Sequence, residues 1–232
     1  MNAALVTGGS SGIGFAIARM LREEDYEVTV VSRRQERVDA AAAALDAHGV
    51  AANVADEADC VRLVQSHVER FGRLDVLVNS AGIGIAGTIK DLPTKHLDLQ
   101  LGINLRGLAL VTRESIPHLC REKGLIVNLA SIAGTLPTPG LSVYGATKAA
   151  VIALTKSLNH ELEDDGVRCT AICPGFVDTP MATWTGLASE TMIRAEDCAE
   201  MVRMLLRLGP AARIPEIVVE RMGERSMALP GA

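Results

Sequence analysis

A tyrosine and a lysine stand four residues apart near the start of a predicted helix, at Tyr144 and Lys148. This spacing places both side chains on one face of the helix. A phenol has a pKa of about 10, which is too high for efficient proton exchange at neutral pH, but a nearby ammonium group lowers it. The pair therefore has the residue types of a proton-exchanging site. For an isolated pair, an ordinary position on a helix surface remains the alternative.

A second candidate site is the segment 7–14, which reads Thr-Gly-Gly-Ser-Ser-Gly-Ile-Gly. It follows a short apolar run and leads into a predicted helix. Glycine lets the backbone turn tightly and approach a pyrophosphate, and the start of a helix offers free N–H groups to an anion. The segment therefore favours dinucleotide binding. The alternative is a strand–helix turn that happens to be rich in glycine and serine.

Short apolar runs alternate with longer helical stretches along the chain. The predicted strands are Ala3–Thr7, Glu27–Ser32, Val50–Val54, Val76–Asn79, Leu125–Leu129, Arg168–Cys173 and Glu216–Val219. The predicted helices are Ile13–Glu24, Gln35–Ala47, Glu57–Phe71, Thr94–Cys120 with a break, Val143–Glu163 and Ala195–Leu208. This alternation is typical of a doubly wound, Rossmann-type α/β fold. We expect a seven-stranded parallel sheet with helices on both faces, in one domain over residues 1–232.

The composition argues against several other classes of protein. The chain has 232 residues, a net charge of −5 and only 3% aromatic residues, which does not suit binding to a nucleic-acid backbone. The sequence has no apolar run long enough for a membrane helix and no signal-peptide pattern, so we expect a cytoplasmic protein. Its five cysteines and five histidines are scattered, and we expect neither a disulfide framework nor a metal site.

Six motifs in order resemble those of the short-chain dehydrogenase/reductase family. They are T-G-x-x-x-G-x-G at 7–14, Asn79-Ser80-Ala81-Gly82, Asn104 in Asn-Leu-Arg-Gly, Ser131, the Y-x-x-x-K pair Tyr144 and Lys148, and Pro174-Gly175. Ser131 precedes Tyr144 by 13 residues, as is usual in that family. Each motif alone is weakly specific, but six in order at the family's spacing are strongly specific, and the resemblance covers about Leu5 to Val219.

The resemblance implies an NAD(P)-dependent oxidoreductase that interconverts a carbonyl and a secondary alcohol. Tyr144 would give a proton to the carbonyl oxygen or remove it from the alcohol, and Ser131 would hydrogen-bond the same oxygen. Lys148 would lower the pKa of Tyr144 and bind the nicotinamide ribose, and Asn104 would hold a water that links Lys148 to solvent. A non-catalytic NADP(H)-binding sensor or regulatory protein is the alternative from another class.

The residues after the second predicted strand favour NADP(H) over NAD(H), which remains possible. Ser32 stands where an NAD-selective site has an acidic residue, and Arg33 and Arg34 could bind a 2′-phosphate. A solvated basic start to a helix is the alternative. Asn53 replaces the aspartate that meets the adenine amino group in the family. The other cofactor contacts implied by resemblance are Gly8, Ser10, Ser11, Gly12, Ile13, Gly14, Val54, Asn79, Ala81, Gly82, Tyr144, Lys148, Pro174, Gly175, Val177 and Thr179.

Three loops that follow predicted strands are the candidates for binding substrate. They are Gly82–Gly87, Ile132–Leu141 and Phe176–Met192, and none contains an arginine or a lysine. We expect Ile83, Ile85, Ile132, Leu141, Phe176, Met181 and Trp184 to line a pocket for a small, neutral or apolar molecule. By resemblance, the helices that begin near Thr94 and Val143 would also pair copies of the chain into a homodimer or homotetramer.

Overall fold

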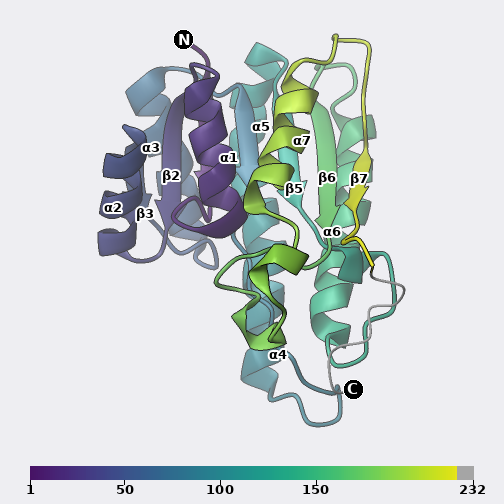
Figure 1. Cartoon of the computed structure of the whole chain (residues 1–232). Coiled ribbons are helices and arrows are strands. Elements are labelled where there is room, and N and C mark those ends of the chain that lie inside the picture. Colours follow the sequence, from purple (N-terminus) through teal and green to yellow (C-terminus); the bar gives the residue numbers. More distant parts are fainter. Residues whose placement is uncertain (224–232) are drawn as a thin grey trace.

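Seven parallel strands form one sheet in the computed structural model, which describes residues 1–223 (Figure 1). The strands are β1 (Ala3–Thr7), β2 (Glu27–Ser32), β3 (His48–Ala51), β4 (Val76–Asn79), β5 (Leu125–Leu129), β6 (Arg168–Pro174) and β7 (Glu216–Val219), in the order β3-β2-β1-β4-β5-β6-β7. The doubly wound parallel sheet expected from the sequence is confirmed. The expected single domain runs to residue 232, and its residues 224–232 lie outside the described part of the chain.

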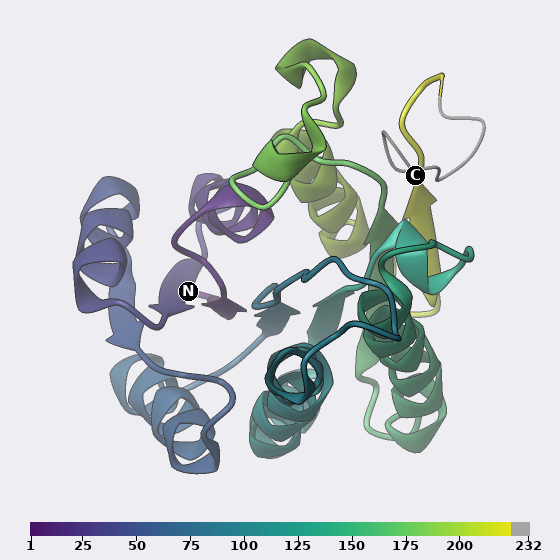
Figure 2. The same ribbon diagram turned by 90° about the horizontal axis from the view of Figure 1, so that it is seen from below.

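Helices cover both faces of this sheet, as the view along the strands shows (Figure 2). One buried cluster joins the sheet to α1 (Gly12–Glu23), α2 (Gln35–Leu45) and α7 (Ala195–Leu206). A second joins the opposite face to α3 (Glu57–Phe71), α5 (Leu108–Glu122) and α6 (Ser142–Glu161). Strands buried on both faces must be almost wholly apolar, which is why β1, β4 and β5 were recognisable in the sequence. No helix within residues 1–223 is long and apolar enough to cross a membrane.

Strand β3 begins two residues before the predicted Val50–Val54 and ends three residues before it. It pairs with β2 from His48 to Ala51, where β2 itself ends at Ser32. The following residues turn towards α3, because the backbone N–H of Asn53 donates to Asp59 Oδ2 (2.7 Å) and Asn53 Oδ1 accepts from Ala55 N (3.2 Å). The polar Asn53 side chain thus ends the strand, which apolar character alone did not reveal.

The predicted helix Thr94–Cys120 has no break. Helix α4 (Thr94–Leu101) continues through a π-helical stretch, Gly102–Gly107, into α5, which ends at Glu122. The wider turn brings Gly107 against the chain after β3, where a Cβ atom would lie 2.5 Å from the carbonyl oxygen of Val54. The bounds of the other helices differ from those predicted by at most two residues.

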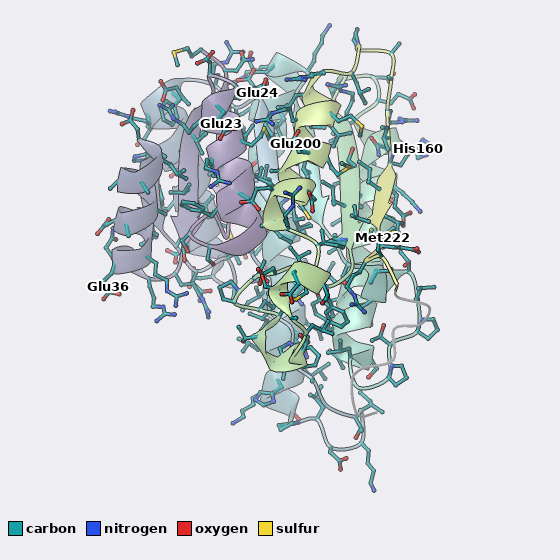
Figure 3. The ribbon with its side chains drawn as sticks, in the orientation of Figure 1. Glu23, Glu24, Glu36, His160, Glu200 and Met222 are labelled. Carbon is teal, nitrogen blue, oxygen red and sulfur yellow. The ribbon has the colours of Figure 1, made fainter. Side chains whose placement is uncertain are left out.

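Ion pairs fasten α7 to α1, the helix that follows the glycine-rich segment (Figure 3). Arg203 of α7 pairs with Glu23 and Glu24 at the end of α1 and with Glu200 in its own helix. Arg19 pairs with Glu196 at 2.7 Å. Exposed ion pairs contribute little stability individually. The apolar contacts between α1 and α7 therefore provide most of the stability of this helix pair.

A buried histidine makes the stability of the fold depend on pH. His67 of α3 is fully buried, with Nδ1 2.7 Å from Thr29 Oγ1 of β2 and its ring against Phe71. Burial lowers the pKa of His67 from 6.5 to about 4. Between these values the unfolded chain binds the proton and the folded chain does not. The free energy of unfolding therefore falls as the pH falls through this window.

We predict that this group costs about 2 kcal/mol of stability between about pH 7 and pH 5. Urea unfolding at both pH values measures the loss. In His67→Asn, whose amide keeps a polar group near Thr29, the loss should be smaller by about that amount. Val64→Ala, which weakens the packing of the same helix without removing a titratable group, is the control and should lower the stability equally at both pH values. An unchanged dependence in His67→Asn would contradict the assignment.

Candidate functional site

The glycine-rich segment closes tightly between β1 and α1. Gly8 and Gly12 have φ angles of +68° and +54°, in the left-handed region that favours glycine. A Cβ on Gly14 would lie 2.4 Å from the carbonyl oxygen of Gly8, and one on Gly8 would lie 2.8 Å from Ala81 N. No side chain caps the start of α1, since Ser11 makes no capping hydrogen bond. The first turn of α1 therefore presents N–H groups to an anion.

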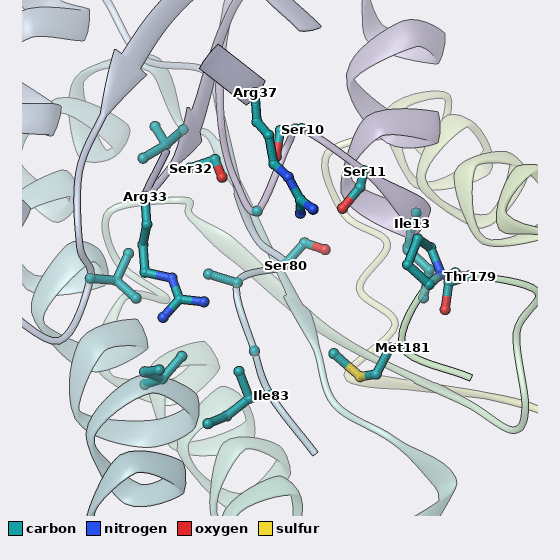
Figure 4. A pocket seen from close by; sticks show the side chains of 18 of the residues that line it. Ser10, Ser11, Ile13, Ser32, Arg33, Arg37, Ser80, Ile83, Thr179 and Met181 are labelled. Atoms are coloured by element: carbon teal, nitrogen blue, oxygen red, sulfur yellow. The ribbon is translucent and has the colours of Figure 1, made fainter. Parts of the chain in front are cut away.

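A cavity of about 270 Å³ lies over this turn. The predicted cofactor residues that line it are Gly8, Ser10, Ser11, Gly12, Ile13, Ser32, Arg33, Asn53, Val54, Ala81, Gly82 and Thr179. Figure 4 shows Arg33 and a further arginine, Arg37, reaching into the cavity from the side of β2 and α2, across from Thr179 and Met181. Its shape and lining suit an elongated ligand with negative charge near α1 and near the two arginines.

Sequence reasoning chose Arg34 as the second basic residue, and the structure places it outside the lining of the cavity. Arg34 is the residue that precedes α2, it is exposed, and it does not line the cavity. Arg37 lines it instead, from the first turn of α2. Among the described residues neither Arg33 nor Arg37 has an ion-pair partner. Arg37 lies in the first turn of the helix predicted from Gln35, and a search of that turn for basic residues could have found it.

A second cavity of about 140 Å³ adjoins the first, and Ile13, Ser80, Gly82, Ile83, Thr179 and Met181 line both. It contains the predicted Ser131, Tyr144 and Lys148, together with Pro174, Gly175 and Val177. Six of the seven predicted substrate residues line it, namely Ile83, Ile132, Leu141, Phe176, Met181 and Trp184. Sequence reasoning missed the small residues Gly84, Ala130, Ala133 and Ala182, whose side chains carry no chemical signal.

The second cavity brings a phenol, a hydroxyl and an ammonium together. Ser131 follows β5, and Tyr144 and Lys148 lie one turn apart on α6. Lys148 is buried, its Nζ donates to the carbonyl oxygen of Leu129 at 2.7 Å, and the same atom lies 5.7 Å from the centroid of the Tyr144 ring. The backbone carbonyl therefore holds the ammonium beside the tyrosine.

The pKa values of this group are governed mainly by burial. Burial raises the pKa of Tyr144, and the Ser131 hydroxyl, as a hydrogen-bond partner, opposes that rise. Burial also lowers the pKa of Lys148 from 10.5 to about 8. The sequence suggested that the ammonium would lower the pKa of Tyr144. In this structure burial is the largest influence on that pKa, and Nζ donates to the Leu129 carbonyl. Such perturbed groups in a cleft are characteristic of functional sites.

Asn104, predicted to hold a water, has its side chain engaged elsewhere and lines neither cavity. Its Nδ2 donates to the carbonyl oxygen of Ile83 (2.9 Å) and to Thr147 Oγ1 (3.1 Å), and its Oδ1 accepts from Ile83 N (2.8 Å). One turn earlier, the buried Gln100 accepts from the backbone N–H of Ile85 through Oε1 at 3.2 Å. Two amides thus clamp the loop after β4.

Three further predicted site residues lie outside the lining of both cavities. Ile85 lines neither cavity, since its segment is held towards α4 by Gln100. Asn79 is buried in the core, where its Nδ2 donates to Thr112 Oγ1 (3.0 Å) and Asn128 Oδ1 (2.9 Å). Gly14 packs on Gly8 and has no exposed surface in the cavity. Asn79 and Gly14 hold the elements that line the site, so their place in the motifs has a structural cause.

Residues 1–223 contain no group of three or more histidine, cysteine, aspartate or glutamate side chains that could hold a metal ion. The polar groups that converge in the second cavity are instead the hydroxyls of Ser131 and Tyr144 and the ammonium of Lys148. Such groups can bind and exchange protons with a single oxygen atom of a ligand. The adjoining anion-binding cavity supplies the place for a second molecule beside it.

The chain is similar to known proteins in sequence and in fold. A family model described as short chain dehydrogenase matches residues 2–188. The chain is 35% identical to 2-(R)-hydroxypropyl-CoM dehydrogenase of Xanthobacter autotrophicus, with 99% of this chain and 94% of that protein covered.

Two solved structures superpose closely. An alcohol dehydrogenase of the archaeon Thermococcus sibiricus, complexed with 5-hydroxy-NADP, gives a TM-score of 0.91 at 28% identity and covers 97% of this chain and 99% of its own. A 3-ketoacyl-(acyl-carrier-protein) reductase of Brucella melitensis, complexed with NADH, gives 0.88 at 29% identity and covers 94% and 96%. Together with the family match, these likenesses place the chain in the short-chain dehydrogenase family, as an NAD(P)-dependent oxidoreductase.

Proposed function

We propose that the protein is an NADPH-dependent reductase and dehydrogenase that interconverts a carbonyl and a secondary alcohol on a small, neutral or apolar substrate. The observation that carries the proposal is the meeting of Ser131, Tyr144 and Lys148 in an apolar cavity that opens onto the glycine-rich turn. Solved relatives described with NADH and with an NADP analogue support a nicotinamide cofactor in the larger cavity.

The residues of the larger cavity fit such a cofactor. Gly8 and Gly12 line this cavity without side chains, so a pyrophosphate would contact bare backbone at the start of α1. Ser32, Arg33 and Arg37 would hold the ribose and its 2′-phosphate. Lys148 and Tyr144 would meet the nicotinamide ribose. When bound, NADPH supplies a hydride, and with it both electrons, to the carbonyl carbon and becomes NADP⁺.

The protein's own residues would handle the proton. Tyr144 donates its phenolic proton to the carbonyl oxygen as that oxygen gains charge, and Ser131 donates a hydrogen bond to the same atom. The Lys148 ammonium stabilises the phenolate that is left. In the opposite direction Tyr144 accepts the proton of the alcohol. Asn104 acts from a distance, since its side chain fixes the backbone at Ile83 on the wall of the cavity.

The lining of the smaller cavity supports a neutral substrate. Apart from Lys148, whose ammonium is bound to the Leu129 carbonyl, no charged side chain lines it. A carboxylate, phosphate or sulfonate on the substrate would lose its hydration there without gaining a counter-ion. The alternative function, NADP(H) sensing without turnover, needs the cofactor cavity but gives no role to the convergence of all three polar groups.

We predict that Tyr144→Phe lowers kcat about a hundredfold or more, since general acid–base catalysis contributes at least that much. The measurement is NADPH oxidation with a panel of neutral ketones. NADPH affinity, titrated by fluorescence, should stay within about threefold, because the hydroxyl is lost but the ring remains. Tyr26→Phe is the matched control, as it removes the chain's other phenol, in the turn before β2. If the wild-type protein binds NADPH stoichiometrically but does not oxidise it with any carbonyl compound tested, the sensor function would be favoured instead.

The cofactor preference is tested with single arginine variants. A charge-assisted hydrogen bond is worth about 1.5–3 kcal/mol, so Arg33→Ala and Arg37→Ala should each raise the Kd of NADPH by about tenfold or more. The Kd of NADH, which lacks the 2′-phosphate, should change by about twofold or less. Arg34→Ala is the control, because the same charge is lost next to the cavity but outside its lining. An equal effect on both cofactors would refute the 2′-phosphate role.

A further inference from the structure

Aromatic side chains are scarce in this chain but gather around the smaller cavity. The sequence has one tryptophan, two tyrosines and three phenylalanines, and Tyr144, Phe176 and Trp184 all line that cavity. Phe176 and Trp184 meet edge to face, with ring centroids 6.4 Å apart and an interplanar angle of 77°. Half of the aromatic residues of the chain thus border a single small space.

The position of Trp184 is held by the segment that carries it. Ile193 N donates to the Phe176 carbonyl (3.0 Å) and Asp178 N donates to the Ile193 carbonyl (2.8 Å), so the two ends of the loop 178–192 are joined. Ser189 hydrogen-bonds the Asp178 carboxylate within this loop. Trp184 lies in a short 3-10 turn, Thr183–Thr185, and remains 50% exposed. Met181, 46% exposed, lines the same cavity, so Trp184 belongs to an apolar wall that is open to solvent.

The size of the cavity limits what can lie against this ring. Its volume of about 140 Å³ is close to that of an apolar protein cavity of about 150 Å³ that accommodates benzene. The remaining walls are aliphatic, from Ile83, Ile132, Ala133 and Leu141. The space therefore has room for one six-membered ring beside the oxygen that Ser131 and Tyr144 would bind, and it offers no free counter-ion to a charged group.

We propose that the substrate is an aryl ketone, or the matching aryl carbinol, and that the Trp184 indole contacts its aromatic ring. Aromatic pairs gain energy beyond the burial of apolar area through their edge and face charges. The ring of Phe176 already packs edge to face with Trp184 and helps to orient it. This inference rests on the proposed carbonyl–alcohol chemistry and adds the class of substrate and the residue that selects it.

A matched pair of ketones separates aromatic contact from general apolar burial. Acetophenone and cyclohexyl methyl ketone have the same skeleton, but only the first has an aromatic ring. Wild-type enzyme should have a kcat/KM for acetophenone about three- to tenfold higher than for the cyclohexyl ketone, the range expected of one aromatic pair. Trp184→Leu should bring this ratio close to one, and Trp184→Phe should retain most of it. Leu136→Ala is the control, since Leu136 is 46% exposed and lines neither cavity.

Binding is measured separately from turnover with the carbinol of acetophenone. Trp184 is the only tryptophan of the sequence, so its fluorescence reports on this wall alone. We expect the carbinol to shift the emission to shorter wavelength in a saturable way and cyclohexyl methyl carbinol to bind several-fold more weakly. NADPH titration of Trp184→Leu shows whether that variant is folded, and Trp184→Phe provides a second test if it is not.

The two proposals can fail independently. An aryl-to-cyclohexyl ratio near one in the wild type, or a ratio that survives Trp184→Leu, overturns the aryl inference, while turnover of either ketone keeps the carbonyl chemistry. The absence of turnover with every ketone overturns the proposed function, and a saturable Trp184 response to the aryl carbinol would still support the aromatic contact.

Discussion

Neighbouring strands β1 and β4 lie side by side at the centre of the sheet, yet the chain leaves them towards opposite faces. From β1 it passes through the glycine turn into α1 and on to β2, whereas from β4 it passes to α4 on the other side and on to β5. Two loops that diverge from adjacent strands cannot fill the space between them, and a crevice opens there. The tight approach of Gly8 to Ala81 sets how closely these loops begin, and both cavities depend on it.

Buried amides then shape the crevice without entering it. Asn79 links β4 to Asn128 of β5 and to Thr112 of α5, and Asn104 binds both backbone groups of Ile83. The Asn104 amide is bonded through both Nδ2 and Oδ1, and the Asn79 amide through Nδ2. Losing such buried bonds is costly, so they favour one arrangement of the elements they join. The result is a cavity whose walls are apolar and whose few free polar groups point at one place. Some motif residues of the family lie outside the cavities because they hold the surrounding backbone in place.

The charged side chains of the two cavities differ in their exposure to solvent. Arg33 and Arg37 are exposed at the larger cavity, where water can solvate them, so their charge costs little free energy to maintain. Lys148 is buried, and its ammonium is maintained by the Leu129 carbonyl at a lowered pKa. The first arrangement favours binding of a charged group. The second keeps the Lys148 ammonium beside the Tyr144 phenol in a mostly apolar cavity.

Much of this could be predicted from residue order alone. Apolar runs such as Ala3–Thr7 and Leu125–Leu129 identify buried parallel strands, because a strand covered on both faces has no polar side, and the spacing of Tyr144 and Lys148 identifies one helix face. The end of β3 and the π-helical stretch were not predictable in this way. The strand ends where Asn53 bonds Asp59 and Ala55, and the π-helical stretch lies where Gly107 packs against Val54. The choice of Arg37 over Arg34 followed from which way α2 faces the crevice.

The sequence by itself determined the fold, the family motifs and the presence of a serine, a tyrosine and a lysine at the right spacing. Local periodicity and short motifs carry that information. Only the tertiary structure decided which of the motif residues reach a cavity, that Asn104 clamps Ile83, and that Phe176 and Trp184 form one aromatic wall. Those outcomes depend on contacts between residues far apart in the chain, and a linear pattern does not encode which side chains such contacts leave free.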